Sequence, residues 1–421
     1  MDWKKVAKKS SILNWINSNL KNYKLKLDLR NMSHYYKKKA AKLNFSYDAN
    51  MAISEFKCWH KANAPDYVPL TEGALRVFWI GSNKDQDESG FLQALQRLAN
   101  VTVFHDFEGE YGTWSGEGSG FESPYFEKVR EINDGLLFEQ LARGKDQGSF
   151  DLLIGQMWAH RISKEALSLV QKMGIPVINI SMDDRLPINW GSKGDVRLGS
   201  VGLVSGTNLV LTTSSETCLW YGVEGCPALF WPLASSPEIF SPDEHNVRDI
   251  DVLFIGNKYG TRGKIVKYLE GNGVKVDCFG AGWPNGHINA EQMASLSKRA
   301  EIILGVGTIG HCDDLYTLKL RDFDAPMSGA LYLTHRNPDL CKLFIEGEEI
   351  ECYSSLKEAL VKIQYYLNNP EKMRLVAEKG FSRACKQHTW DKRLNETFSM
   401  LGLVNQFPIK EKVSKVENWL E

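Results

Sequence analysis

The chain has 421 residues, 51 of them basic and 52 acidic, which gives a formal charge of -1 at pH 7. Hydrophobic residues at 43% and charged residues at 24% are typical of globular proteins and exclude a largely disordered chain or a collagen-like fibre. The length predicts two or three domains. The near-zero charge excludes attraction of the whole molecule to nucleic acid or acidic lipid, so any such affinity must come from a local patch.

Eight cysteines are spread along the sequence without a C-x-x-C pair or a histidine spacing that would close a tetrahedral zinc site. We interpret them as reduced thiols. The first thirty residues lack the apolar segment and small-residue cleavage site of a signal peptide, and no segment has the roughly 18 consecutive apolar residues of a spanning helix. These features predict a cytoplasmic protein, either soluble or peripheral at the inner face of the membrane.

Residues 1–70 form a basic N-terminal extension, whose first 60 residues carry thirteen Lys or Arg and four Asp or Glu. Within residues 1–20, apolar side chains at helical spacing stand beside lysines, which is the pattern of a basic amphipathic helix. Two interpretations stay open: the helix packs on the main body with its lysines in water, or it contacts an anionic membrane surface. Apolar residues then alternate with polar ones over residues 23–29, which predicts a short strand.

Residues 71–240 are predicted to form an N-terminal α/β domain. Apolar runs ending near polar or glycine-containing loops predict strands, and a segment with helical spacing follows the first of them at 90–100. The predicted strands are 74–83, 101–107, 150–157, 175–182 and 208–214. Fully apolar strands separated by helices indicate a parallel sheet that is covered on both faces.

The pattern starts again after a proline-containing acidic linker near 235–248, and residues 248–400 are predicted to form a second α/β domain. A helix is expected at 262–273, and the predicted strands are 250–260, 274–280, 300–307 and 329–335. Residues 401–421 are predicted to be a helical segment that returns to the N-terminal domain. Ligands of open parallel sheets bind outside the carboxyl ends of the strands, so two facing domains leave a cleft between their loop edges.

Two cations and one carboxyl group lie close together in the second domain, in the stretch LKLRDFDAPMSGALYLTH (318–335). Lys319 and Arg321 suit phosphate oxygens, and Asp324 suits the hydroxyls of a ribose. The alternative interpretation is a solvated helix in which Arg321 and Asp324 form an i,i+3 ion pair.

The same region carries an ordered series of motifs. They read R-D-F-D-A-P-x-x-G-A, G-E-E-I-x-x-Y-x-S-L-K-E-A, Y-Y-L-x-N-P-E-K and H-T-W-D-x-R. Over roughly residues 250–400 the sequence resembles CgeB-like, group 1 glycosyltransferases of the GT-B fold. The resemblance implies an α/β fold of GT-B type, with two Rossmann-like parallel-sheet domains facing across a cleft. It also implies transfer of a sugar from a nucleotide-sugar to an acceptor hydroxyl of a glycan, polysaccharide or glycoconjugate.

The resemblance assigns donor-binding roles in the C-terminal domain. Asp324 matches the ribose-binding acid of the family, whereas Tyr316 stands eight positions earlier, where many members have a second acid. Arg262, at the start of a helix, resembles an arginine near the donor phosphates, although a structural salt bridge is an open alternative. The expected donor site contains Gly256, Arg262, Lys319, Arg321 and Asp324.

The resemblance places catalytic groups in the N-terminal domain. His160, just after a predicted strand, is the first candidate, because imidazole titrates near neutral pH. The alternative is a histidine whose nitrogens bond nearby backbone groups. Asp184 is the second candidate for a general base and Asp106 the third.

Trp158 and Trp190, on predicted loops, are expected to stack on an acceptor sugar, while the other tryptophans of this half are expected in the core. The paired acids Asp183-Asp184 and Asp313-Asp314 suit a divalent cation. We nevertheless predict no essential metal and no cofactor, because GT-B proteins use basic residues and helix ends for the leaving diphosphate.

Three other functions stay open: a nucleotide-sugar 2-epimerase of the same architecture, a non-catalytic spore-coat or surface-assembly protein, and a glycosyltransferase that modifies DNA. Nucleic acid is not among the partners that we expect.

Overall fold

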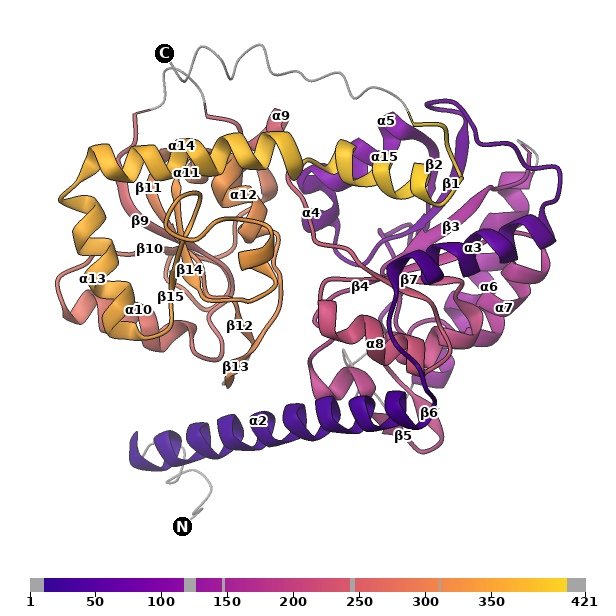
Figure 1. Ribbon diagram of the computed structural model, residues 1–421, viewed down its shortest axis with the longest axis horizontal. Helices are drawn as coiled ribbons and strands as arrows, with labels where there is room; N and C mark the ends of the chain where they lie inside the picture. Colours follow the sequence, from indigo (N-terminus) through magenta and orange to yellow (C-terminus); the bar gives the residue numbers. More distant parts are fainter. Residues whose placement is uncertain (1–10, 117–125, 146–147, 243–246, 310–311, 407–421) are drawn as a thin grey trace.

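The computed structural model describes residues 11–116, 126–145, 148–242, 247–309 and 312–406. Two α/β domains, each built on a parallel sheet, lie side by side (Figure 1). The long helix α2 (Ser11–Lys42) precedes them and runs beneath both domains in this view. The helix α3 (Ala49–Asn63) then leads into the first sheet.

The N-terminal domain contains six parallel strands in the order β2-β1-β3-β4-β7-β8. Successive residues of β1 enter different hydrophobic clusters, Val77 and Trp79 on one face of the sheet and Phe78 and Ile80 on the other. In a strand that is buried on both faces, side chains on either face enter a hydrophobic core, which explains the nearly continuous apolar runs of the sequence. The strands are β1 (Leu75–Ile80), β2 (Ala99–Val103), β3 (Leu152–Gly155), β4 (Val177–Ser181), β7 (Leu209–Thr212) and β8 (Ala228–Phe230).

Helices cover both faces of this sheet. They are α4 (Lys84–Gln86), α5 (Leu92–Leu98), α6 (Phe126–Lys145), α7 (Lys164–Lys172) and α8 (Ser215–Val223). Short elements complete the domain: a π-helix η1 (Asp87–Phe91), the 3-10 helices η2 (Pro187–Trp190) and η3 (Ser200–Gly206), and the hairpin β5 (Ser192–Lys193) and β6 (Val196–Arg197).

The C-terminal domain repeats the architecture with five parallel strands in the order β10-β9-β11-β14-β15. The strands are β9 (Ile250–Ile255), β10 (Asp277–Phe279), β11 (Ala300–Leu304), β14 (Leu331–His335) and β15 (Glu351–Tyr353). A short hairpin, β12 (Thr308–Ile309) and β13 (Cys312–Tyr316), follows β11. The other elements are α9 (Pro237–Phe240), α10 (Arg262–Gly271), α11 (Ala290–Arg299), α12 (Arg321–Met327), η4 (Leu340–Lys342), α13 (Leu356–Leu367), α14 (Pro370–Gln387) and α15 (Trp390–Met400).

The chain returns to the N-terminal domain through α15 (Figure 1). Arg97 on α5 donates two hydrogen bonds, of 2.7 and 2.6 Å, to the carboxylate of Asp391. The described part of the predicted helical segment 401–421 is not helical: residues 401–406 form a turn and a bridge between Val404 and Leu70. Residues 407–421 lie outside the described residues.

The strand predicted at 23–29 is wrong, because these residues belong to α2. The alternation arises because residues four apart share a helix face: Leu25 and Leu29 pack in a hydrophobic cluster with residues of both domains, whereas Tyr23 and Leu27 are exposed. A period of two over seven residues therefore fits both a strand and two opposite stripes of a helix.

The described part of α2 packs against both domains. Tyr36 stacks on Trp220 with ring centroids 5.1 Å apart and donates a 2.9 Å hydrogen bond to Glu224. Residues Cys312 and Leu315 of the hairpin in the C-terminal domain belong to the same hydrophobic cluster as Tyr36. Residues 25–42 of α2 thus pack on the main body, whereas the two interpretations of residues 1–20 stay predictions, because residues 1–10 lie outside the described residues. Over the residues that were searched, no helix has the length and apolar character needed to cross a membrane.

Candidate functional site

A cavity of about 390 Å³ lies between the two domains. Its walls are the loops that follow β1 and β4 in the N-terminal domain and the loops that follow β9 and β10 in the C-terminal domain, together with the segment that leads into α12. The cavity thus lies at the carboxyl ends of the strands in both domains, where open parallel sheets bind ligands. All five predicted donor-site residues line it: Gly256, Arg262, Lys319, Arg321 and Asp324.

Two guanidinium groups form the cationic wall of the cavity. Arg321 donates a hydrogen bond to the carbonyl oxygen of Ile255 and lies 4.9 Å from the ring centroid of Phe254. Arg262 donates a 2.9 Å hydrogen bond to the carbonyl oxygen of Asn257 and lies 4.2 Å from the ring centroid of Tyr259. Backbone carbonyls and aromatic faces therefore hold both groups in place.

The charge of these two groups is poorly compensated. Neither arginine forms a salt bridge with a carboxylate of the described residues, and the Nε of the buried Arg262 has no hydrogen-bond partner among them. Burial, and secondly the nearby Arg321 charge, lower the pKa of Arg262 to about 10. Two adjacent cations that have no salt bridge to a carboxylate among the described residues suit an anionic ligand, because an anion would add both opposite charge and hydrogen-bond acceptors.

Gly256 permits this arrangement. Its φ of +148° lies in a region that side-chain-bearing residues rarely adopt, and an added Cβ would lie 2.6 Å from Nη2 of Arg321 and 3.2 Å from Nη1 of Arg262. The absence of a side chain at this position therefore lets both guanidinium groups approach the end of β9.

Lys319 connects the C-terminal domain to the opposite wall. Its Nζ lies 2.6 Å from Oδ1 of Asp183, which follows β4 in the N-terminal domain. Asp183 is one of two described non-glycine residues with positive φ, at +58°. Such a conformation costs roughly 1–3 kcal/mol and is concentrated at functional sites. The pair therefore joins the two domains across the cavity through a residue with a strained backbone.

Asp324 is a buried carboxyl group with 5% of its surface exposed. Its Oδ1 accepts a 2.7 Å hydrogen bond from Ser235 Oγ, and burial raises its pKa to about 8. No salt bridge joins it to Arg321 among the described residues, so the i,i+3 ion pair considered from the sequence is not formed. Asp324 lines the cavity, where its carboxyl group is available to a ligand hydroxyl.

The structure places the predicted catalytic residues outside the cavity. His160 is 7% exposed, and its Nδ1 lies 3.0 Å from the carbonyl oxygen of Leu198. Burial lowers its pKa to about 4, so the ring is neutral at pH 7. Asp106 lies in a turn, where Oδ1 accepts 2.9 Å hydrogen bonds from the backbone of Glu108 and of Glu110. Both side chains thus interact with backbone groups of the N-terminal domain.

Asp184 is 1% exposed and points into the N-terminal domain, opposite to its neighbour Asp183. Its carboxylate accepts hydrogen bonds from Ser181, from Tyr221 at 2.8 Å and from Thr212 at 2.5 Å. Burial raises its pKa to about 6 despite these bonds. The sequence offered two adjacent acids, and the one that lines the cavity is Asp183.

The two tryptophans predicted to bind the acceptor do not line the cavity either. Trp190 is 8% exposed, packs against Tyr36 of α2 and donates a 2.5 Å hydrogen bond to the carbonyl oxygen of Asp184. Trp158 is half-buried, with its ring centroid 6.2 Å from that of His160. The local sequence around Trp190 does not indicate that a helix far away in the chain buries this side chain.

The sequence interpretation missed the loop after β1. Asn83, Gln86 and Ser89 line the cavity. Just beneath them, the buried Asp87 accepts a 2.8 Å hydrogen bond from the hydroxyl of Tyr111. The π-helix η1 departs from helical geometry at Ser89 and Gly90, and such irregular turns are frequent at functional sites. The sequence feature that could have indicated this loop is the run Gly-Ser-Asn after an apolar strand.

Comparisons with known proteins agree with this geometry. A family model described as glycosyl transferase-like matches residues 262–399. No curated protein matches the chain. The structure of sucrose-phosphate synthase from Thermosynechococcus elongatus is similar with a TM-score of 0.55 and 12% identity, over 78% of this chain and 98% of that one.

A second similar structure is HepE of Anabaena in complex with UDP, with a TM-score of 0.50 and 10% identity over 77% of this chain and 100% of that one. HepE has also been solved in complex with UDP-glucose. At these identities the likeness shows the fold alone. The chain is therefore an α/β protein of the GT-B fold, and its residues 262–399 are glycosyl transferase-like.

Proposed function

We propose that this protein is a glycosyltransferase of the CgeB-like type, which moves a sugar from a nucleotide-sugar to an acceptor hydroxyl. The observation that carries the proposal is the pair Arg262 and Arg321, two cations without a carboxylate partner among the described residues, beside the carboxyl of Asp324 in one cavity. A nucleoside diphosphate combines the two matching chemistries: phosphate oxygens for the cations and ribose hydroxyls for Asp324.

The donor would lie along the C-terminal wall of the cavity. Arg262 and Arg321 would hold the diphosphate, with Lys319 reaching it from the segment before α12. Because negative charge accumulates on the diphosphate as the sugar leaves, fixed cations stabilise the transition state more than the bound donor. HepE binds UDP and UDP-glucose, which makes uridine diphosphate sugars the first donors to test.

We assign the acceptor-side carboxylate to Asp183. Oδ1 of this carboxylate lies 2.6 Å from Nζ of Lys319. A bound diphosphate would compete for Lys319 and release Asp183 toward the acceptor. The acceptor oxygen would then form a bond to the anomeric carbon while its proton passes to Asp183. The bond from that carbon to the diphosphate oxygen would break, and the diphosphate would keep the electron pair.

No divalent cation is needed in this scheme, because three fixed cations supply the positive charge for the leaving diphosphate. Turnover in the presence of a chelator tests the prediction that no metal is essential. Turnover that disappears with the chelator and returns with Mg²⁺ would show that the protein cations are insufficient.

The proposal is tested by calorimetry with two ligands, uridine and UDP. Arg262→Ala and Arg321→Ala should each weaken UDP binding much more than uridine binding, because only UDP carries the diphosphate. Lys275→Ala is the matched control: Lys275 is a cation of the same domain, but it is exposed and outside the cavity. If both arginine variants bind UDP like wild type, the phosphate assignment is incorrect.

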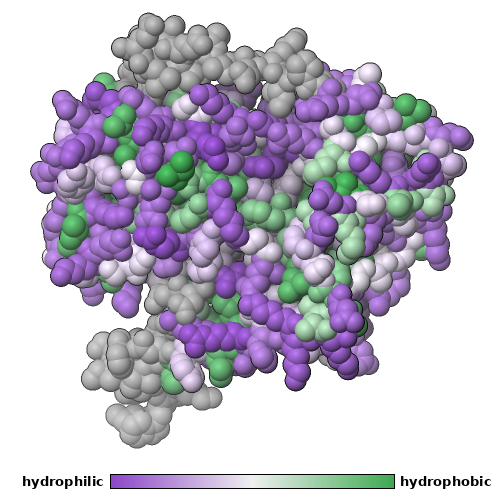
Figure 2. Space-filling view, in the orientation of Figure 1, coloured by the Kyte–Doolittle hydropathy of each residue, from purple (hydrophilic) through white to green (hydrophobic). Residues whose placement is uncertain are grey.

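We further propose that α2 brings the enzyme to an anionic membrane surface at the cytoplasmic face, where a glycoconjugate acceptor would be located. Leu20, Tyr23 and Leu27 are 60%, 68% and 45% exposed and share one helix face, since they are spaced by three and four residues. Figure 2 shows hydrophilic residues along most of this helix, with hydrophobic ones among them. Exposed apolar residues among lysines favour binding at a lipid interface.

Vesicle sedimentation tests this second proposal. The variant Leu20→Glu/Tyr23→Glu/Leu27→Glu should bind vesicles of anionic lipid less than wild type does. The control is Leu375→Glu, which changes a comparably exposed leucine, 55% exposed, on α14 of the C-terminal domain. Equal binding by both variants would remove α2 from the membrane contact.

A further inference from the structure

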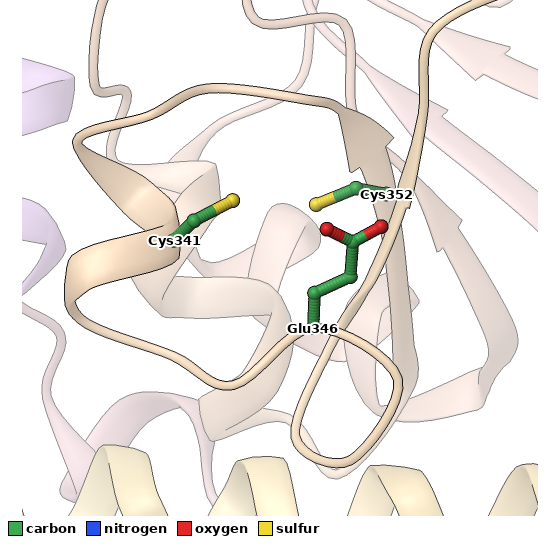
Figure 3. Close-up of side chains that lie close together, drawn as sticks. All are labelled: Cys341, Glu346 and Cys352. Carbon is green, nitrogen blue, oxygen red and sulfur yellow. The ribbon is translucent and has the colours of Figure 1, made fainter.

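Two thiols face one another in the C-terminal domain, away from the cavity (Figure 3). Cys341 lies on η4, and Cys352 lies on β15, at the edge of the sheet. The two Sγ atoms and a carboxylate oxygen of Glu346 all lie within 4.8 Å of one another. Cys352 is fully buried, whereas Cys341 is partly accessible.

The two thiols differ in their ionisation. A hydrogen bond with Cys352 is the largest influence on Cys341, and together with the charge of Arg336 it lowers the pKa of Cys341 to about 7 in spite of burial. The same hydrogen bond, burial and the Cys341 charge raise the pKa of Cys352 far above its usual range. The accessible sulfur is thus the one that forms a thiolate, and the buried sulfur keeps its proton and points at it.

A metal ion is the other chemistry that two thiols and a carboxylate suggest, but the surroundings oppose it. Arg336 makes a bidentate ion pair with Glu346, Nη2 lying 2.5 Å from Oε1 and Nη1 bonding the other oxygen. Nζ of Lys362 is a second cation, 3.9 Å from Oε1. Both oxygens of the third potential ligand are already engaged, and two positive charges stand where a cation would bind.

We propose that Cys341 and Cys352 are a reversible dithiol pair that oxidises to an intramolecular disulfide. With hydrogen peroxide as oxidant, the Cys341 thiolate attacks one peroxide oxygen, the O–O bond breaks, and the leaving hydroxide takes a proton from solvent, so that a sulfenic acid and one water form. The sulfur of Cys352 then attacks the sulfur of Cys341, the S–O bond breaks and a second water leaves. One hydrogen peroxide is reduced to two waters as two thiols become one disulfide.

Cys341 lies close in sequence to residues that form a contact between the domains. Asp339, two residues before Cys341, accepts hydrogen bonds from the backbone N and the Oγ of Ser215 at the start of α8, at 3.0 and 2.5 Å. Lys342, the next residue after Cys341, lies with its Nζ 3.1 Å from the same Oγ. A disulfide requires the sulfurs to approach from within 4.8 Å to about 2.05 Å, by rotation of the side chains together with a shift of η4 toward β15. A shift of η4 would act on the Asp339–Ser215 contact and hence on how the domains close.

The disulfide is tested on the full reduced chain, treated with hydrogen peroxide, alkylated and digested for mass spectrometry. We expect a peptide pair linked through Cys341 and Cys352, loss of two of the eight thiols, and full recovery with dithiothreitol. Cys341→Ser and Cys352→Ser should abolish the link. Cys385→Ser is the matched control, because the Sγ of Cys385 lies 3.6 Å from Met327 Sδ and no other cysteine contacts it among the described residues.

Two results would overturn the proposal. The first is oxidation of Cys341 to sulfinic acid without a link to Cys352 in the wild-type chain, a result that does not depend on whether the variants fold. The second is one zinc ion per reduced chain, held by Cys341 and Cys352 and lost in both serine variants. The effect on domain closure rests on the proposed function: oxidation should reduce turnover of a nucleotide-sugar at least several-fold in wild type but not in Cys341→Ser. If wild type turns over no nucleotide-sugar in either state, the proposed function fails while the peptide link still tests the disulfide.

Discussion

Gly256→Ala separates a backbone effect from the role of the two arginines. An alanine at φ +148° would cost about 1–3 kcal/mol in backbone strain, and its Cβ, 2.6 Å from Nη2 of Arg321, would force that guanidinium to move. A hydrogen bond to a charged group is worth about 1.5–3 kcal/mol, so loss of one such contact with a phosphate should weaken UDP binding by about 10- to 150-fold. Uridine binding should change far less.

The control is Gly273→Ala in the same domain. Gly273 has φ +82°, and an added Cβ would have no neighbour within 4 Å, so this variant adds backbone strain without touching the cavity. Urea denaturation measures the stability of both variants, and calorimetry measures UDP and uridine affinity. The reasoning is refuted if Gly256→Ala is destabilised but binds UDP as tightly as Gly273→Ala does.

Three further predictions concern titratable groups. Asp183→Asn should lower turnover by at least 100-fold with little change in donor affinity, because Asp183 lines the cavity. Asp184→Asn should mainly lower the melting temperature, because Asp184 is buried outside the cavity. Equal turnover by the two variants would show that neither residue acts as the base. Burial raises the pKa of Asp324 to about 8 in the folded chain, against 3.8 for an exposed aspartate, so the folded chain keeps a proton that the unfolded chain releases. The stability it contributes is present at low pH and lost as the pH rises toward 8, and urea titrations of Asp324→Asn should lack this component. His160 has a folded pKa of about 4 against 6.5, so its contribution is present above pH 6.5 and lost as the pH falls toward 4. In His160→Gln the free energy of unfolding should change less with pH between 4 and 6.5, and turnover should stay near wild type. A loss of turnover at unchanged stability would show that His160 has a catalytic role.

The C-terminal wall of the cavity could be predicted from sequence because its residues belong to short segments. Arg321 and Asp324 lie on one helix, and Gly256 and Arg262 follow one strand, so local pattern and resemblance were enough to group them. Parallel topology then brings these segments to the same edge of the sheet.

The N-terminal wall of the cavity could not be predicted in the same way, because it depends on the orientation of side chains, which the local sequence does not specify. Asp183 and Asp184 are neighbours, and of the two it is Asp183, with its positive φ, that lines the cavity. Trp190 is covered by Tyr36, a residue more than a hundred positions away in α2. The same helix was partly mistaken for a strand, because its two stripes alternate over residues 23–29.

The central claim is that the cavity cleaves the bond between a sugar and a nucleoside diphosphate. The most direct measurement is an NMR time course of the protein with a panel of nucleotide-sugars, UDP-glucose first, with water or an added glycan as acceptor. We predict release of the nucleoside diphosphate together with free or transferred sugar, and loss of that release in Arg321→Ala. An isomerised nucleotide-sugar without release would indicate an epimerase, and binding of the donors without any change would indicate a non-catalytic platform. Either result would contradict the account.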